Sequence, residues 1–204
     1  MSENPGLRAD AARNRDVVLE AATRAFAAES EPSMRAIARE AGVGIATLYR
    51  HFPTREALVD AVYRDQVDRL TRGADELLER YAPAEALRRW MDLFGDWLVT
   101  KHGMVDTLRE MIEAGSLAHV ETRDQLLAAI GSILDAGRGA GDLRPDVRPD
   151  DVAAALIGVF TVAGTSAREG QGARLLDLLL DGLRSAPRSV VPASVLPERH
   201  EHLP

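Results

Sequence analysis

The chain contains no cysteine, which excludes disulfide bonds, thiolate nucleophiles and zinc sites built from cysteine ligands. Lysine is almost absent as well, since Lys101 is the single lysine among 25 basic residues. No apolar run approaches the roughly 20 residues that a membrane-spanning helix needs, and residues 1–16 are polar and lack the apolar core of a signal sequence. We therefore expect a cytoplasmic protein that does not contact a membrane.

The chain also lacks the positive charge expected of a protein that binds nucleic acid, because its net charge is −7. The acidic residues are unevenly distributed. Residues 1–60 hold eight arginines against nine carboxylates, whereas the rest of the chain holds 17 basic residues against 23 acidic ones. Attraction to phosphate depends on local charge, so the N-terminal part can still present arginines on one face.

Strand-like alternation of apolar and polar residues is missing too, and almost every segment has helical periodicity. Hydrophobic residues make up 46% of the chain, which is enough for a sizeable core. The pattern predicts an all-α protein of about nine helices. The expected ranges are 11–29, 34–41, 45–52, 55–80, 83–101, a shorter helix between 103 and 115, 122–139, 150–167 and 171–185.

Residues 34–52, MRAIAREAGVGIATLYRHF, have the features of a helix-turn-helix. Ser33 can cap the first of the two short helices, and Gly42 can adopt the positive φ that ends this helix sharply. Ile37 and Leu48 would supply apolar contacts between the helices. The outer side of the second helix is then free to enter the major groove of DNA. The same pattern is open to a second interpretation, an αα-hairpin in an unrelated helical bundle.

The stretch AIAREAGVGIATLYRHFPTREALVDAV resembles the TetR family of bacterial transcriptional regulators, and the resemblance extends over about residues 13–62. It implies a helix-turn-helix DNA-binding domain over 10–55 and a helical domain over 56–186 that binds an effector and dimerises. The proline-punctuated segment 187–204 is expected to be a disordered tail. Gly44 departs from the serine that is frequent there in the family, so a capping or phosphate-binding hydroxyl is absent.

The resemblance also assigns DNA contacts, residue by residue, to the outer side of the helix over 45–52 and to arginines that flank it. Arginine can pair with a guanine edge or a phosphate, and the hydroxyls of threonine and tyrosine suit phosphate oxygens. Upstream, Arg8 or Arg13 is expected to add a contact. The predicted DNA-binding residues are Arg35, Ile45, Ala46, Thr47, Tyr49, Arg50, His51 and Arg55.

The last two expected helices, 150–167 and 171–185, are too apolar all round for helices with one exposed side. Either they are buried inside a monomer, or one face meets a second copy of the chain in a four-helix bundle. The resemblance implies the second alternative, because members of the family dimerise through their last two helices.

Aromatic and thioether side chains are concentrated on two neighbouring expected helices, 83–101 and the shorter one after it. Such side chains suit an adaptable apolar pocket for a small molecule, although ordinary core packing would explain them as well. The predicted ligand-binding residues are Trp90, Met91, Phe94, Trp97, Met104, Leu108 and Met111. Phe160 and Ile130 could close the far side, and the candidate polar anchors are Glu110, Glu113, Arg109 and His119.

Catalytic signatures are not found, since the sequence contains neither a serine nucleophile elbow nor a glycine-rich phosphate loop. His51, His102 and His119 lack metal-ligand spacing, and His200 and His202 fall in the expected tail. We expect no catalytic residue, no metal and no cofactor. The function expected is a dimeric repressor of a palindromic DNA operator, released by an unidentified small molecule; a ligand-binding protein without DNA recognition is the alternative.

Overall fold

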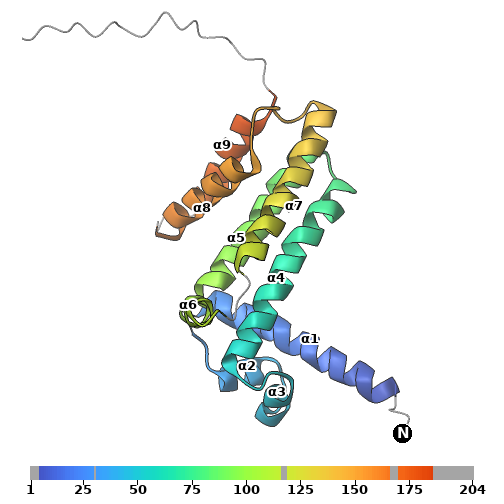
Figure 1. Ribbon diagram of the computed structural model, residues 1–204, viewed down its shortest axis with the longest axis vertical. Helices are drawn as coiled ribbons and strands as arrows, with labels where there is room; N and C mark the ends of the chain where they lie inside the picture. The colour runs from blue at the N-terminus through green and yellow to red at the C-terminus, as the bar shows by residue number, and fades with distance from the viewer. Residues whose placement is uncertain (1–4, 30, 116–118, 166–169, 186–204) are drawn as a thin grey trace, which may run out of the picture.

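The computed structural model describes residues 5–29, 31–115, 119–165 and 170–185, and within them it contains nine helices and no strand (Figure 1). The all-α prediction is confirmed. The helices are α1 (Pro5–Ala28), α2 (Met34–Glu40), α3 (Ile45–His51), α4 (Arg55–Leu78), α5 (Pro83–His102), α6 (Val105–Glu113), α7 (His119–Ala140), α8 (Pro149–Thr165) and α9 (Gln171–Leu183). The segment 187–204, expected to be a disordered tail, lies outside the described residues.

Helices α1, α2 and α3 form a small head at one end of the molecule (Figure 1). Its core is apolar, with Phe26, Ile37 and Leu48 all essentially inaccessible to solvent. The side chain of Ser33 accepts a hydrogen bond from the backbone N–H of Ala36 and so satisfies one of the free donors at the start of α2. Gly42 has φ +67°, the left-handed conformation that lets the chain turn directly from α2 toward α3.

The remaining six helices form the body, in which α4, α5 and α7 run alongside one another (Figure 1). Helix α4 leaves the head directly, and the side chain of Thr54 caps its first turn through the N–H of Ala57. One continuous apolar core extends from the head through the body. No helix of the described residues is long and apolar enough to cross a membrane.

Helices α8 and α9 pack against each other; α9 also packs against α5, and α8 packs mainly against α7 (Figure 1). Their inner faces contribute Val152, Leu156, Leu176 and Leu180 to the core. Their outer faces stay apolar in the single chain, where the side chains of Ile157 and Leu178 are 52% and 67% exposed. An ion pair of 2.7 Å between Arg88 and Asp177 fixes α9 to α5 without covering that apolar surface.

The head is joined to the body by a close approach of Gly103, at the end of α5, to the end of α1. A side-chain Cβ at Gly103 would lie 1.9 Å from the backbone oxygen of Phe26, and the carbonyl of Gly103 accepts a 3.1 Å hydrogen bond from the N–H of Glu31. No larger residue therefore fits at position 103 without separating the two helices.

Substituting Gly103 by alanine is expected to destabilise the protein by about 2 kcal/mol or more, because the clash is with backbone that cannot rotate away. The measurement is the midpoint of urea unfolding. Gly139→Ala is the matched control, since a Cβ there meets nothing within 4 Å and should stabilise α7 by about 0.5–1 kcal/mol. Equal stability of the two variants would contradict this account of the junction.

Candidate functional site

Helix α3 presents a polar and aromatic surface to solvent while one side chain anchors the helix to the head. Leu48 is fully buried, whereas four other side chains of the helix are exposed to solvent. The exposed set, called the recognition surface below, consists of Ile45, Ala46, Tyr49 and Arg50. Within the described part of the chain, Tyr49 and Arg50 have no hydrogen-bond partner, so both side chains are available to an external ligand.

Three more of the predicted DNA-binding residues lie in or beside this surface with different exposure. Thr47 and His51 are half-buried on α3, and Arg35 is exposed in the first turn of α2. The Nε2 atom of His51 is buried and has no partner among the described residues, while its ring lies 6.4 Å from that of Phe52. Arg13 is exposed on α1.

Arg55 does not belong to the recognition surface, although the sequence suggested it as a DNA contact. Its guanidinium turns inward, forms an ion pair with Glu31, donates a 2.6 Å hydrogen bond to the carbonyl oxygen of Pro32 and lies 5.4 Å from the centre of the Phe26 ring. Its Nε donates to the hydroxyl of Thr107 over 3.2 Å. In this conformation every donor group of Arg55 serves the protein itself.

These contacts form a polar junction between the head and α6, made of Glu31, Pro32, Arg55 and Thr107. Thr107 is buried and also donates to Glu31 over 3.5 Å. Glu31 has φ +57°, a left-handed conformation that is unfavourable for a residue with a Cβ. The junction links Arg55, the first residue of α4, to Thr107 in α6. A movement of α6 would therefore displace the start of α4, which follows directly after α3.

The predicted ligand-binding residues are all buried in the body. Trp90, Phe94 and Trp97 form a row along α5, with ring centroids 5.6 Å and 5.2 Å apart. Phe160 of α8 lies 6.3 Å from Phe94 and rests on Gly95, where a Cβ would come within 2.5 Å of its ring. The other members, Met91, Met104, Leu108 and Met111, belong to the same apolar core, as does Ile130.

The indole groups of this row differ in their hydrogen bonding. Trp90 Nε1 donates to the carbonyl oxygen of Leu70 over 2.9 Å, so Trp90 fastens α5 to α4. Trp97 Nε1 is buried and has no partner among the described residues. Of the polar anchors suggested by the sequence, Arg109, Glu110 and Glu113 are exposed on α6; the side chain of His119 lies outside the described residues.

Two residues near Trp97 were not singled out as site residues by the sequence. Tyr63 of α4 has its ring 6.4 Å from that of Trp97, and the Nζ of Lys101 lies 4.9 Å from the Trp97 ring centre. Burial raises the pKa of Tyr63, an effect partly opposed by the nearby hydroxyl of Thr122, and burial lowers the pKa of Lys101. The available sequence signals were weak: Tyr63 is the one aromatic residue of α4, and Lys101 the one lysine.

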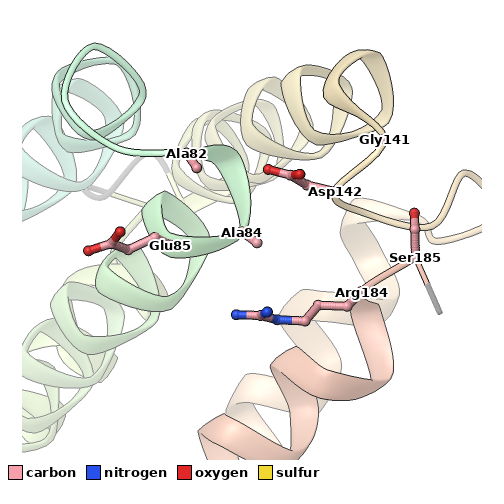
Figure 2. A pocket seen from close by; sticks show the side chains of 7 residues that line it. All are labelled: Ala82, Ala84, Glu85, Gly141, Asp142, Arg184 and Ser185. Atoms are coloured by element: carbon pink, nitrogen blue, oxygen red, sulfur yellow. The ribbon is translucent and has the colours of Figure 1, made fainter.

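A separate hollow of about 450 Å³ lies at the end of the body away from the head. Figure 2 shows it between the start of α5, the turn after α7 and the end of α9, with the side chains of Glu85, Asp142 and Arg184 around it. Its lining is largely polar and open to solvent, and it lies apart from the aromatic row. In the described ranges no three histidine or acidic side chains come together as a metal site.

Two family models match the chain. The model described as "Bacterial regulatory proteins, tetR family" matches residues 18–62, and the model described as "Transcriptional regulator SbtR-like, C-terminal domain" matches residues 82–185. The first match contains α2 and α3, and the second contains α5 to α9.

Solved structures and a curated protein agree with these matches. A TetR transcriptional regulator from Streptomyces coelicolor is 45% identical, covers 83% of this chain and 98% of its own, and superposes with a TM-score of 0.74. A TetR regulatory protein from Mycobacterium vanbaalenii is 38% identical over 87% and 99% of the two chains, with a TM-score of 0.69. The HTH-type transcriptional repressor KstR2 of Mycolicibacterium smegmatis is 26% identical over 194 residues, 88% of this chain and 95% of that protein.

Proposed function

Because the chain belongs to the TetR family of bacterial transcriptional regulators, we propose that it represses transcription as a homodimer on a palindromic operator, and that a small-molecule effector releases it. It is a DNA-binding regulator, and the family consists of transcriptional regulators rather than enzymes. Tyr49 and Arg50 carry the proposal for DNA contact, because both are exposed on α3 and have no hydrogen-bond partner in the described ranges. The relative named a repressor supports repression as the outcome.

The proposed DNA contacts are the recognition surface, together with Thr47, His51 and Arg35. Arg50 is suited to a guanine edge or a phosphate, the hydroxyls of Tyr49 and Thr47 to phosphate oxygens, and Ala46 to a thymine methyl group. Arg55 is not included, because its guanidinium is engaged in the junction. Since Gly44 carries no hydroxyl, the N-cap position of α3 contributes no side-chain hydrogen bond to a phosphate.

The outer faces of α8 and α9 are proposed as the dimer interface, because exposed apolar side chains of this size are otherwise unfavourable in water. A two-fold dimer presents two copies of α3, each to one half-site. The operator is then an imperfect palindrome whose half-site centres lie at least about 10 bp apart.

Release is proposed to follow from ligand contact in the body. Helix α4 begins beside α3 and carries Tyr63 to the Trp97 ring, so the same helix touches both sites. An effector that binds one spacing of the two heads about 3 kcal/mol more tightly than the other changes DNA affinity by over a hundredfold. A ligand with equal affinity for both spacings would have no effect.

The proposal is tested by a gel-shift titration of the purified protein against the DNA upstream of its own gene. We expect a discrete complex containing one dimer, competed by specific but not by unrelated DNA. Compounds that dissociate the complex should change tryptophan fluorescence over the same concentration range, since both tryptophans lie in the aromatic row. Binding no tighter than to unrelated DNA would refute specific recognition at this site.

Thr107→Val is expected to reduce communication between effector and DNA, because it removes the hydroxyl that joins α6 to Arg55 and Glu31. Loss of a hydrogen bond to a charged group is worth about 1.5 kcal/mol, so the effector should change operator affinity roughly tenfold less than in the parent protein. Gel shifts with and without effector measure this ratio. Thr71→Val is the control, since among the residues that the structure describes the Thr71 hydroxyl donates only to the carbonyl oxygen of Val67, within α4. Unaltered release by Thr107→Val would show that the signal bypasses the junction.

A further inference from the structure

Two neighbouring aromatic side chains carry buried hydrogen-bonding atoms that have no partner among the described residues. The Tyr63 hydroxyl and Trp97 Nε1 are inaccessible, and the residues are only 3% and 5% exposed. Thr122 lies close enough to affect the pKa of Tyr63, yet no hydrogen bond of normal geometry joins them among the described residues. Buried polar groups are nearly always paired, and an unpaired one costs stability. Two together, from different helices, indicate a place shaped for an acceptor.

A positive charge lies beside the Trp97 ring. The Lys101 ammonium group lies over the face of the Trp97 ring, and among the described residues no carboxylate forms an ion pair with it. A partly buried ammonium without a counterion is unfavourable, and a bound anion would remove that cost. The indole N–H of Trp97 and the ammonium group of Lys101 can only donate hydrogen bonds, and the Tyr63 hydroxyl can donate one as well. A ligand that accepts hydrogen bonds and carries negative charge therefore suits all three.

The remainder of the row is apolar. From Trp97 it continues through Phe94, which is almost fully buried, to the half-buried Phe160 that rests on Gly95. Phe160 comes from α8, so its side chain can be displaced without moving the packing of α4 on α5. An elongated ligand placed here would have a polar end at Tyr63 and Trp97 and an apolar body along Phe94.

We propose that this site binds an apolar carboxylic acid, with its carboxylate at the Tyr63 hydroxyl, Trp97 Nε1 and the Lys101 ammonium group, and its hydrocarbon part along Phe94 and Phe160. The two carboxylate oxygens accept from both orphan donors at once, and the negative charge is matched by Lys101. A neutral ester or ketone would leave the ammonium without a counterion. The regulatory consequence of binding, but not the binding itself, rests on the proposed function.

The test uses the full chain with a panel of octanoate, decanoate and 4-cyclohexylbutyrate, each compared with its methyl ester by calorimetry and thermal melting. We expect at least one acid to bind and to raise the melting temperature, and its ester to bind at least tenfold more weakly. Lys101→Met should remove this preference, whereas Arg69→Met, which removes an exposed charge from α4, should keep it. Tyr63→Phe should weaken the acid about tenfold without lowering the melting temperature of the free protein, because it removes only the hydroxyl. Trp97→Phe should weaken the acid at least as much, but it also leaves a cavity in the core and should lower the melting temperature.

The proposal is overturned if none of the acids binds, if esters bind as tightly as acids, or if Lys101→Met keeps the preference. It also fails if Tyr63→Phe melts earlier and binds the acid normally, since the hydroxyl would then be satisfied within the fold, for instance by a bridging water. A separate gel shift distinguishes binding of the acid at this site from its effect on operator binding. If the acid binds with the expected preference over its ester and is weakened by the three substitutions, but does not release the operator, the site is supported and effector control is refuted. If a compound releases the operator and its affinity is unchanged in all three variants, effector control is supported and the proposed site is overturned.

Discussion

Replacement of Leu178 by glutamate is expected to produce monomers that bind the operator at least a hundredfold more weakly than the parent protein. Leu178 is the most exposed large apolar side chain of α9, at 67%, and Ile157 of α8 is exposed as well. At a two-fold interface the substitution occurs twice and places two like charges in an apolar environment, which costs several kcal/mol. A monomer can engage only one half-site, so it loses the second set of DNA contacts.

Analytical ultracentrifugation at micromolar concentration, followed by gel shift on the same samples, measures both effects. Ile112→Glu provides the control, because Ile112 is also an exposed apolar residue, at 43%, but lies on α6 next to the head (Figure 1). It should remain a dimer. A parent protein that sediments as a monomer, or a Leu178→Glu variant that remains a dimer with full operator affinity, would place the interface elsewhere or remove it.

The helices were predictable from the sequence because local signals mark most of their ends. Ser33 and Thr54 cap α2 and α4, Pro83 begins α5, and Gly42 has the positive φ expected at the end of a short helix. The largest difference is at α1, which begins at Pro5 rather than at residue 11. Residues 5–10 lack apolar periodicity, but Pro5 suits the first turn of a helix and Leu7, Arg8 and Ala9 have good helix propensity.

The side-chain environments were much less predictable. Arg55 has the appearance of a surface arginine in the sequence, but its partners lie 23, 24 and 52 residues away, and their proximity follows only from the packing of α1, α4 and α6. The apolar run LLDLLL predicts a buried helix, yet it does not reveal that Leu178 faces outward while Leu179 is half-buried. Whether Tyr63 and Trp97 find hydrogen-bond partners likewise depends on distant residues of other helices.

The recognition surface was predictable because its periodicity is local: Leu48 inward and Tyr49 with Arg50 outward follow from the turn of a single helix. What a local pattern does not supply is the chemistry of the contact. Tyrosine and arginine can both reach a phosphate, and arginine can instead read a guanine, so the two roles have to be separated by measurement.

Arg50→Met is expected to lower operator affinity by about a thousandfold, since a specific arginine contact is worth about 2 kcal/mol and occurs once in each half-site. Tyr49→Phe should cost less, because it removes one hydroxyl contact per half-site and keeps the ring, which is 46% exposed. Both variants should stay folded dimers, as neither side chain is hydrogen-bonded to the described parts of the protein.

Titrations over a range of salt concentrations separate the two roles of Arg50. If Arg50 binds phosphate, the slope of log K against log salt falls by about two for the dimer and unrelated DNA is affected equally; if it reads a guanine, the slope changes little and the preference at one base pair is lost. The control is Arg69→Met, which makes the same change of charge in the body and should bind the operator as tightly as the parent protein does. If Arg50→Met and Tyr49→Phe both bind the operator like the parent protein, α3 presents a different face to the DNA.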